Sequence, residues 1–494
     1  MKIIDDLEFI KQTKNSIKIS IQNKGLLSSD LIEELPQKIN EFLLSDPGIW
    51  SQEYYDSIFF GGKAEWVEAK YLAEYNNSLN IINDYMSFPV VNPGEQVFYY
   101  LVSIVDVVEN IITLNNITGD YTVDWGDGSP EENFITNSTN ATHSYPFSSI
   151  TSNLTPDGYK QAIIKVTPQA GSNLISFGSS GGNIAKHCVG VYLNSSFLTS
   201  ANFNSWRNLK FASINENNIT SFNNMFNGCY SLTTVPLLDT SSGTNFSSMF
   251  QNCSSLTTIP LLNTSNGTSF ISMFNGCYSL TTIPLLDTSN GTNFSSMFGA
   301  CGSLTTIPLL DTSNGNDFSG MFNSCYSLTT IPLLDTSNGT SFNSAFSRCY
   351  SLTTIPLINT SKVTNFNFMF QFCYSLTTIP LLDTSSGTGF SSMFSYCYSL
   401  TTIPLLDTSS GTSFSNMFLS ITNLRRSQLI NTKLTISYQN CNLSRTALVE
   451  IFTNLFDLTS LTSQNINITG NPGVATLTQT DRDIALNKNW TITG

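Results

Sequence analysis

The chain has 494 residues, of which 40% are hydrophobic and 11% are charged, and its formal net charge is −14. This length exceeds the roughly 250–300 residues at which a single hydrophobic core stops growing, so we expect several domains or a repeat array with attached domains. The acidic balance and the lack of any cluster of Lys and Arg argue against a nucleic-acid-binding protein, because phosphate contacts need clustered positive charge.

Residues 1–94 are predicted to form a mixed, mostly helical segment, punctuated by Pro36, Pro47, Pro89 and Pro93. The opening MKIIDDLEFIKQ has two Asp and no apolar stretch, so we expect no secretory signal peptide. The sequence contains no run of about 18 apolar residues, so no membrane-spanning segment is predicted. Residues 17–25 (IKISIQNKG) followed by 35–39 (LPQKI) resemble a short motif of phage tail and appendage proteins. The resemblance implies that residues 1–94 attach the chain to other virion proteins.

Residues 95–185 are predicted to be all-β. An alternating strand in residues 121–128 (YTVDWGDG) ends in an Asp-Gly turn, and HSY at 143–145 and GYKQAIIKV at 158–166 follow. The order W-G-D-G, H-x-Y and G-Y-x-x-x-I-x-V is similar to PKD domains, which are small β-sandwiches used as spacers in surface proteins. The resemblance implies structural roles for Trp125, His143 and Tyr145, while residues 133–140 depart from the pattern as a polar loop.

A repeat of 24 residues dominates the rest of the chain. The block F-x-x-M-F-x-x-C-Y-S-L-T-T-I-P-L-L-D-T-S-N-G-T recurs over residues 222–418, and Phe222 to Phe414 spans eight complete periods. We expect residues 186–221 to be degenerate repeats that form an N-terminal cap. Self-similarity at this period indicates a solenoid, in which stacked units share one continuous core.

Each period predicts one strand and one short helix. Residues 232–240 match L-x-x-L-x-L-x-x-N with Thr in the final place, so strand alternation points Leu232, Val235 and Leu237 inward. The same alternation turns Thr234, Pro236 and Leu238 toward an open concave face. A D-T-S-S-G-T turn follows, and residues 246–253 have apolar side chains at i, i+3, i+4 and i+7, as on a convex helix. These units predict an α/β solenoid with one parallel sheet.

The repeats resemble BspA-like leucine-rich repeats, whose unit reads M/A-F-x-x-C-x-x-L-x-x-I and, in one subtype, D-T-S-N-V-T. Residues 359–364 (NTSKVT) and 369–373 (MFQFC) match that subtype best, whereas the other periods replace Val by Gly. The resemblance covers about 200 residues. It implies adhesion or structural roles in general and names no ligand.

Residues 419–494 leave the period and are predicted to form the C-terminal cap. A helix is expected over residues 444–455 with Ser444 as its N-cap, and a strand over 465–469. The ending ITGNPGVATLTQTDRDIALNKNWTITG resembles the tails of phage tail-fibre proteins.

Two ladders of side chains are candidates for disulfide formation or metal binding. The eight cysteines at the period of 24 residues are expected to be reduced, buried thiols, because parallel rungs hold their Cβ atoms farther apart than a disulfide needs. An aspartate ladder has two interpretations, Asx capping of each turn or calcium binding through carboxylate oxygens. Its members are Asp239, Asp287, Asp311, Asp335, Asp383 and Asp407.

An apolar strip is the candidate binding surface. The strip would contact a receptor or a neighbouring subunit, or curvature would hide it. A tyrosine ladder that includes Tyr230, Tyr278 and Tyr326 is a second candidate, either stacking on sugars or packing laterally. The strip consists of Pro236, Leu238, Pro260, Leu262, Pro284, Leu286, Pro308, Leu310, Pro332, Leu334, Pro356, Ile358, Pro380, Leu382, Pro404 and Leu406.

The functional expectation is a phage virion appendage, a tail or head fibre, made in the host cytoplasm. It would be a homo-oligomer that contacts a host-surface protein or glycan through the solenoid. No cofactor, metal or catalytic residue is expected, because the acidic residues repeat along a rod instead of converging in a cleft. A bacterial cell-surface adhesin is the alternative, and a virion-associated glycan-degrading enzyme is a distant third.

Overall fold

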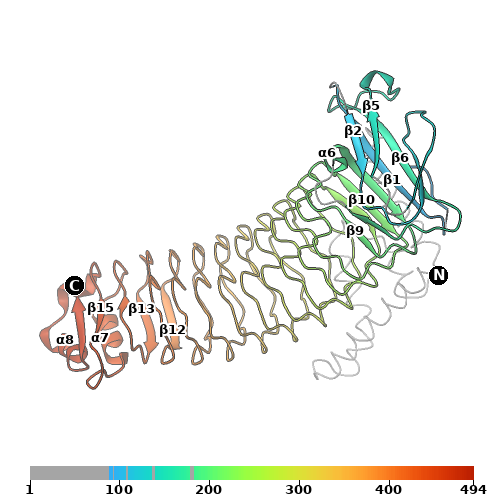
Figure 1. The fold of residues 1–494 in the computed structure, drawn as a ribbon. Helices are drawn as coiled ribbons and strands as arrows, with labels where there is room; N and C mark the ends of the chain where they lie inside the picture. The colour runs from blue at the N-terminus through green and yellow to red at the C-terminus, as the bar shows by residue number, and fades with distance from the viewer. Residues whose placement is uncertain (1–87, 93, 107–109, 136–139, 179–182) are drawn as a thin grey trace, which may run out of the picture. The chain divides into compact units, whose positions relative to one another are not determined.

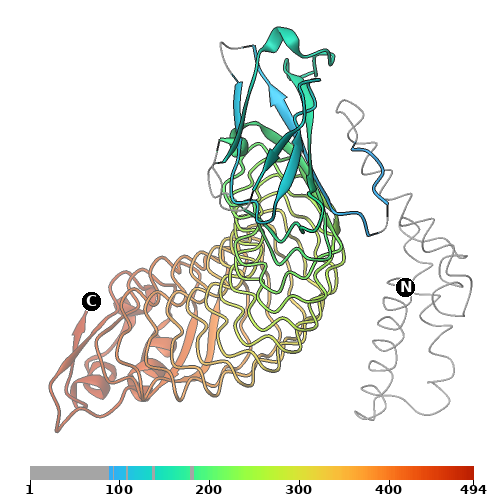
Figure 2. The same cartoon turned by 45° about the vertical axis from the view of Figure 1, so that its right-hand side comes forward.

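The computed structural model describes residues 88–494, except 93, 107–109, 136–139 and 179–182. All but the last residues of the predicted attachment region, 1–94, lie outside the described residues. In the described part, a β-rich domain leads into a long solenoid that ends in a cap with two helices (Figure 1). Figure 2 shows the same succession of rungs from a second direction.

The β-rich domain joins the solenoid through one sheet of seven strands. The strand order is β11-β10-β8-β1-β6-β3-β4, antiparallel from β4 to β8 and parallel from β8 to β11. The strands shared with the solenoid are β8 (Cys188–Asn194), β10 (Phe211–Asn215) and β11 (Thr234–Leu238). The strands β2 and β5 form a separate antiparallel pair whose buried side chains join the same core, and β7 pairs with β9 (Ser200–Asn202). The sheet therefore crosses the predicted boundary at residues 185 and 186. The elements are β1 (Val97–Ile104), β2 (Asn110–Leu114), β3 (Tyr121–Asp124), β4 (Glu132–Phe134), β5 (Ala141–Tyr145), η1 (Phe147–Ser149), β6 (Lys160–Pro168), β7 (Ser176–Gly178) and α6 (Ile184–His187).

The three residues of the W-G-D-G and H-x-Y motifs pack against one another. The rings of Trp125 and His143 stack with centroids 4.9 Å apart, and the Tyr145 hydroxyl donates a hydrogen bond to the Trp125 carbonyl at 2.7 Å. His143 Nε2 lies 2.7 Å from a carboxylate oxygen of Asp127. Trp125 and Tyr145 are fully buried, so the motif serves packing in this domain.

The solenoid begins with β8 (Cys188–Asn194), β9 (Ser200–Asn202), β10 (Phe211–Asn215) and β11 (Thr234–Leu238), and it ends with β12 (Thr402–Asp407) and β13 (Arg426–Ile430). Between β11 and β12 the T-T-I-P-L-L segments form no ladder, so the predicted single parallel sheet is wrong. The physical reason is that two adjacent segments with a central proline both lack an N–H to donate there, whereas β11 and β12 pair with β10 and β13, which contain no proline. One parallel bridge per period, such as Ser221 with Asn245, joins the rungs elsewhere.

The predicted convex helix is also wrong, because tandem turns take its place. Ser248 and Asn252 have φ of 54° and 60°, and the equivalent residues of other rungs share this left-handed conformation, which a right-handed helix forbids. Alternate backbone N–H groups donate to the next rung instead of along a helix. In one rung these bonds run from Phe246 to Ser269, Ser248 to Ile271, Phe250 to Met273 and Asn252 to Asn275, at 2.7–3.0 Å.

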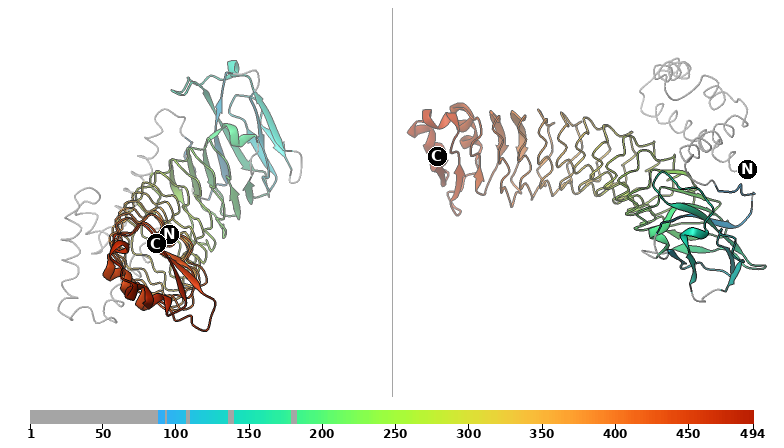
Figure 3. Two further views of the ribbon diagram at one scale, coloured as in Figure 1. Left: turned by 90° about the vertical axis from the view of Figure 1, so that its left-hand side faces the viewer. Right: turned by 90° about the horizontal axis from the view of Figure 1, so that it is seen from above.

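The interior consists of stacked phenylalanines. From Phe226 to Phe418 one column has ring centroids 5.5–6.0 Å apart in adjacent rungs, and a second column begins at Phe222. A Cβ at Gly291 would lie 2.7 Å from the Phe294 ring, so glycine makes room for the rings at this position. Figure 3 shows the rungs following one another along the solenoid. The buried side chains of successive rungs form one continuous core.

The C-terminal cap confirms the predicted helix and strand. The Ser444 hydroxyl accepts a hydrogen bond from the Ala447 N–H at 3.3 Å at the start of α7, and β15 covers most of the predicted strand at residues 465–469. The Phe226 column continues into the cap, where Tyr438 stacks on Phe418 at 4.6 Å. The elements are β14 (Ile436–Ser437), α7 (Arg445–Asn454), β15 (Gln464–Asn467), η2 (Pro472–Thr476), α8 (Gln479–Leu486) and β16 (Trp490–Thr493).

The cap should lose stability in acid through Asp481. Two hydrogen bonds from Arg445, at 2.8 and 3.0 Å, and one from the Thr478 N–H lower the pKa of Asp481 well below its usual range. A depressed pKa in the folded state stabilises the cap above the unfolded pKa of about 3.9, and this contribution disappears as the pH falls further. Melting temperatures of the wild type and Asp481→Asn should therefore differ at pH 7 and converge toward pH 2. A constant difference over that range would contradict the prediction.

Candidate functional site

A row of leucines forms the most regular apolar feature of the solenoid surface. Each leucine directly follows the proline of its rung and exposes 48–64% of its surface. The row, called the leucine row below, consists of Leu261, Leu285, Leu309, Leu333, Leu357, Leu381 and Leu405.

Two apolar residues follow the proline of each rung, and the predicted strip included the second of them, which is buried, instead of the exposed first. The second residue of the pair is 0–7% exposed, and the prolines from Pro260 to Pro404 are half-buried. The buried residues that were predicted to be exposed are Leu238, Leu262, Leu286, Leu310, Leu334, Ile358, Leu382 and Leu406.

A bulge at the proline explains the difference. In β12, Ile403 pairs with Ser427 and Leu406 with Leu429, so three steps along β12 match two steps along β13. The extra residue restarts the alternation, and both Ile403 and Leu406 point inward. Leu405 is left facing solvent, where strict alternation would have placed it inside.

The faces beside the leucine row differ in charge. On one side lie exposed threonine pairs such as Thr305 and Thr306, which are neutral. On the other side, two residues after each exposed leucine, lies the column of Asp and Asn side chains that opens the turn. The row is therefore a neutral strip with one acidic edge.

The aspartates of that edge cap their turns, which confirms the Asx interpretation. Asp311 Oδ1 accepts hydrogen bonds from the Ser313 N–H at 3.0 Å and the Ser313 hydroxyl at 2.7 Å. Asp239, Asp287, Asp335, Asp383 and Asp407 each accept the N–H of the serine two residues later. Across the described residues, no group of three or more His, Cys, Asp or Glu side chains could hold a metal ion.

A buried threonine ladder was missed by the sequence analysis. The hydroxyl of Thr312 donates a hydrogen bond to the Asp335 carbonyl of the next rung at 2.7 Å, and its equivalents do the same at 2.7–2.9 Å. These threonines are 0–3% exposed. Their only sequence signal is that Thr occupies the Asn position of the repeat in every period.

All ten cysteines are buried and unpaired, as predicted for packed thiols. In the repeats, each S–H group donates a hydrogen bond of 3.0–3.2 Å to a phenylalanine carbonyl of the preceding rung. Burial raises the pKa of Cys277 and Cys325 to about 12. The thiols therefore contribute packing and hydrogen bonds at neutral pH and little thiolate.

The tyrosine ladder is largely self-stacked. Tyr326, Tyr350, Tyr374 and Tyr398 lie face to face with centroids 4.7–5.3 Å apart. Because each ring covers the face of its neighbour, the inner rings have no open face for a sugar. The geometry favours the lateral-packing interpretation of this ladder.

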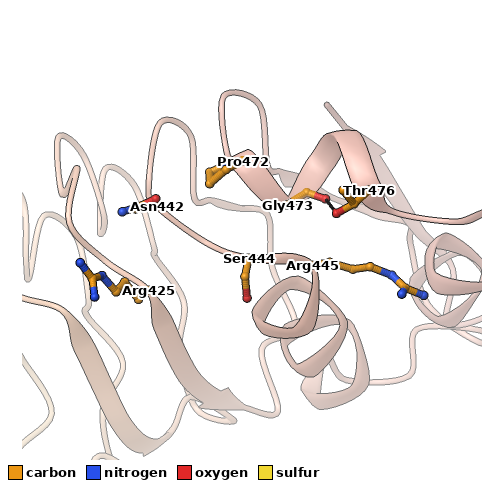
Figure 4. Close-up of a pocket in the computed structure, with 7 residues that line it drawn as sticks. All are labelled: Arg425, Asn442, Ser444, Arg445, Pro472, Gly473 and Thr476. Carbon is orange, nitrogen blue, oxygen red and sulfur yellow. Dashed lines mark hydrogen bonds between the residues drawn. The ribbon is translucent and has the colours of Figure 1, made fainter.

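A pocket of about 440 Å³ lies in the cap (Figure 4). Its lining side chains are engaged in the fold, since Ser444 caps α7 and Arg445 binds Asp481. Arg425 and Arg445 point in opposite directions, so they do not converge on a ligand. The other lining residues are Asn442, Pro472, Gly473 and Thr476.

Within the described residues, no helix has the length and apolar character needed to cross a membrane. Few residues of the solenoid lie in helices or strands. Two solved structures are similar to this chain at low identity. A leucine-rich-repeat protein of T. pallidum shares 19% identity with a TM-score of 0.24, over 52% of this chain and 90% of that one. The mouse RP105/MD-1 complex shares 13% identity with a TM-score of 0.23, over 64% of this chain and 49% of that one.

None of the curated proteins matches the chain. A family model described as "Mycoplasma protein of unknown function, DUF285" matches residues 192–306, 259–354, 293–379 and 340–442. These overlapping stretches cover residues 192–442, just over half of the 494 residues. The chain therefore belongs to the DUF285 family.

Proposed function

We propose that this protein is a non-catalytic interaction protein that contacts other proteins through the leucine row. The proposal rests on the alignment of seven exposed leucines, one per rung, on a neutral face. Together they expose an apolar strip on the order of 700 Å², above the few hundred Å² that a monomeric surface usually presents. Such strips mark contact surfaces.

The composition of the repeats supports a role without catalysis. Between residues 221 and 418 there are seven Asp, no Glu, one Arg and one Lys. Six of the aspartates cap turns along the rod, and the seventh, Asp317, accepts the Ser319 N–H in the same way. Both histidines of the chain are engaged, His143 with Asp127 and His187 with the Ser103 carbonyl. In the described part of the chain, the repeat aspartates are therefore spaced along the rod and serve as turn caps.

As its setting we propose a phage particle, with residues 1–94 attached to other virion proteins and the solenoid projecting as a tail or head fibre. The support is the motif within residues 17–39 and the fibre-like ending of the sequence. A PKD-like spacer at residues 95–185 fits this setting, since Trp125 and Tyr145 pack as the motif implies. A host-surface protein or glycan would be the receptor.

A cell-surface adhesin is the alternative setting. The family name refers to Mycoplasma proteins, and the repeats resemble BspA-like adhesins. The contact surface would be the same, but the chain would reside on a cell. Density maps of intact particles and antibody labelling of intact cells separate the two settings.

The leucine row is tested by Leu309→Asn, Leu333→Asn and Leu357→Asn in one full chain. The matched control is Asn290→Ser, Asn314→Ser and Asn338→Ser, which changes three exposed residues on another face where other rungs already carry Ser. We expect the leucine variant to lower incorporation into the particle or cell surface, or adsorption to the host, at least tenfold. The control should behave like the wild type. A leucine variant equal to the wild type in both measurements would show that the function lies elsewhere.

Deletion of residues 257–304 removes two periods without breaking the register. If the solenoid acts as a spacer, the projection shortens and adsorption is unchanged. If it contacts the receptor along its length, adsorption falls with the loss of Leu261 and Leu285.

A further inference from the structure

The period of the leucine row restricts what can cover it. One leucine projects from each rung, and in the Phe226 column the rings of adjacent rungs have centroids 5.5–6.0 Å apart. A partner with apolar groups at the interval of the rungs matches the row over all seven leucines. Another copy of this solenoid has that interval by construction.

The size of the face fits a stable pair. With the half-buried prolines and the flanking threonines, each copy would bury on the order of 800 Å², which is the standard contribution of one partner to a specific interface. Thr, Pro and Leu supply this face, so no charged group has to be desolvated at its centre.

The acidic edge selects one orientation. If a two-fold axis runs across the solenoid, the aspartate column of one copy faces that of the other, and carboxylates such as Asp311 and Asp335 repel. If the axis runs along the solenoid, each aspartate column faces the neutral threonine column of the other copy. The parallel arrangement therefore avoids the repulsion and brings the two N-terminal regions to the same end.

We propose that the leucine row binds a second copy of this chain in a parallel, face-to-face homodimer. This inference rests on the proposed function of the row as a contact surface and identifies its partner. It assigns Leu309, Leu333 and Leu357 to the centre of the dimer interface.

Sedimentation of the full chain tests the pairing. We expect the wild type and the Asn290→Ser, Asn314→Ser, Asn338→Ser control to have twice the mass of the 54.3 kDa chain at micromolar concentration. The triple leucine variant should have a dimer dissociation constant at least 100-fold higher than that of the wild type. At concentrations at which both proteins are monomeric, its melting temperature should stay close to that of the control. A wild type that remains monomeric at 100-fold higher concentration, or a triple variant that dimerises like the wild type, would overturn the proposal.

Cross-linking tests the orientation. All native thiols are buried, so an introduced Leu285→Cys provides the reactive position. In the parallel dimer two copies of this variant place residue 285 opposite itself, and oxidation should link them. In an antiparallel dimer centred on Leu333, residue 285 faces Leu381, and only a mixture of Leu285→Cys and Leu381→Cys chains would link.

The two proposals fail separately. A monomeric wild type whose triple leucine variant still loses adsorption or incorporation would refute the second copy and keep the contact function. A triple variant without effect on mass, adsorption or incorporation would refute both.

Discussion

Phe298→Ala should lower the free energy of unfolding of the solenoid by about 3–5 kcal/mol, the usual cost of truncating a buried phenylalanine to alanine. Phe298 is fully buried and stacks on Phe274 and Phe322, both at 5.8 Å. The alanine leaves a cavity inside a column whose rungs are held by their neighbours. Urea unfolding followed by circular dichroism measures the change.

Phe298→Leu is the matched control, because it keeps most of the apolar volume. We expect it to cost clearly less than the alanine variant. Asn314→Ser, at an exposed turn position where other rungs carry Ser, should change stability by less than about 0.5 kcal/mol. A loss below about 1 kcal/mol for Phe298→Ala would mean that the phenylalanine column does not hold the rungs together.

The ten cysteines should be almost inert toward a thiol reagent in the folded protein at pH 8. Each is buried, and a pKa near 12, as for Cys277 and Cys325, lowers the thiolate fraction at pH 8 by about 10³-fold relative to a free cysteine. Because the reagent also cannot reach the sulfur atoms, the observed rate should fall further. Absorbance with a chromogenic disulfide reagent measures the labelling.

Unfolding in guanidinium should release all ten thiols at once, which distinguishes masking from oxidation. Asn314→Cys gives the positive control, since a thiol at this exposed turn position should react within seconds in the folded chain. Fewer than ten thiols in denaturant would reveal disulfides, and rapid labelling of native wild type would show that the rungs open.

Part of the interior was predictable because the spacing of apolar residues along the sequence indicates which side chains lie on the same side of a rung. Phe246, Met249, Phe250 and Cys253 were predicted to be inward and are fully buried, although no helix forms. Tandem turns repeat every four residues, so they place i, i+3, i+4 and i+7 on one side much as a helix does. The pattern therefore identified the buried set without identifying the backbone.

The surface was less predictable because a single extra residue reverses side-chain direction. Strict alternation assigned Leu262 to the outside and the position of Leu261 to the inside, whereas the structure exposes Leu261 and buries Leu262. Proline in every rung was visible in the sequence. The effect of proline on side-chain direction depends on which carbonyl and N–H groups can still pair. These groups belong in part to the next rung.

The sequence by itself determined that units of 24 residues stack and which aromatic and sulfur side chains fill the stack. Only the tertiary structure decided the hydrogen bonding, because the partners belong to different rungs. The Ser248 N–H meets the Ile271 carbonyl at 2.7 Å, and the Thr312 hydroxyl meets the Asp335 carbonyl at the same distance. Local propensity describes neighbours along the chain, whereas these pairs are 23 residues apart. Turns whose backbone N–H groups donate hydrogen bonds to the next rung therefore form in place of helix and sheet.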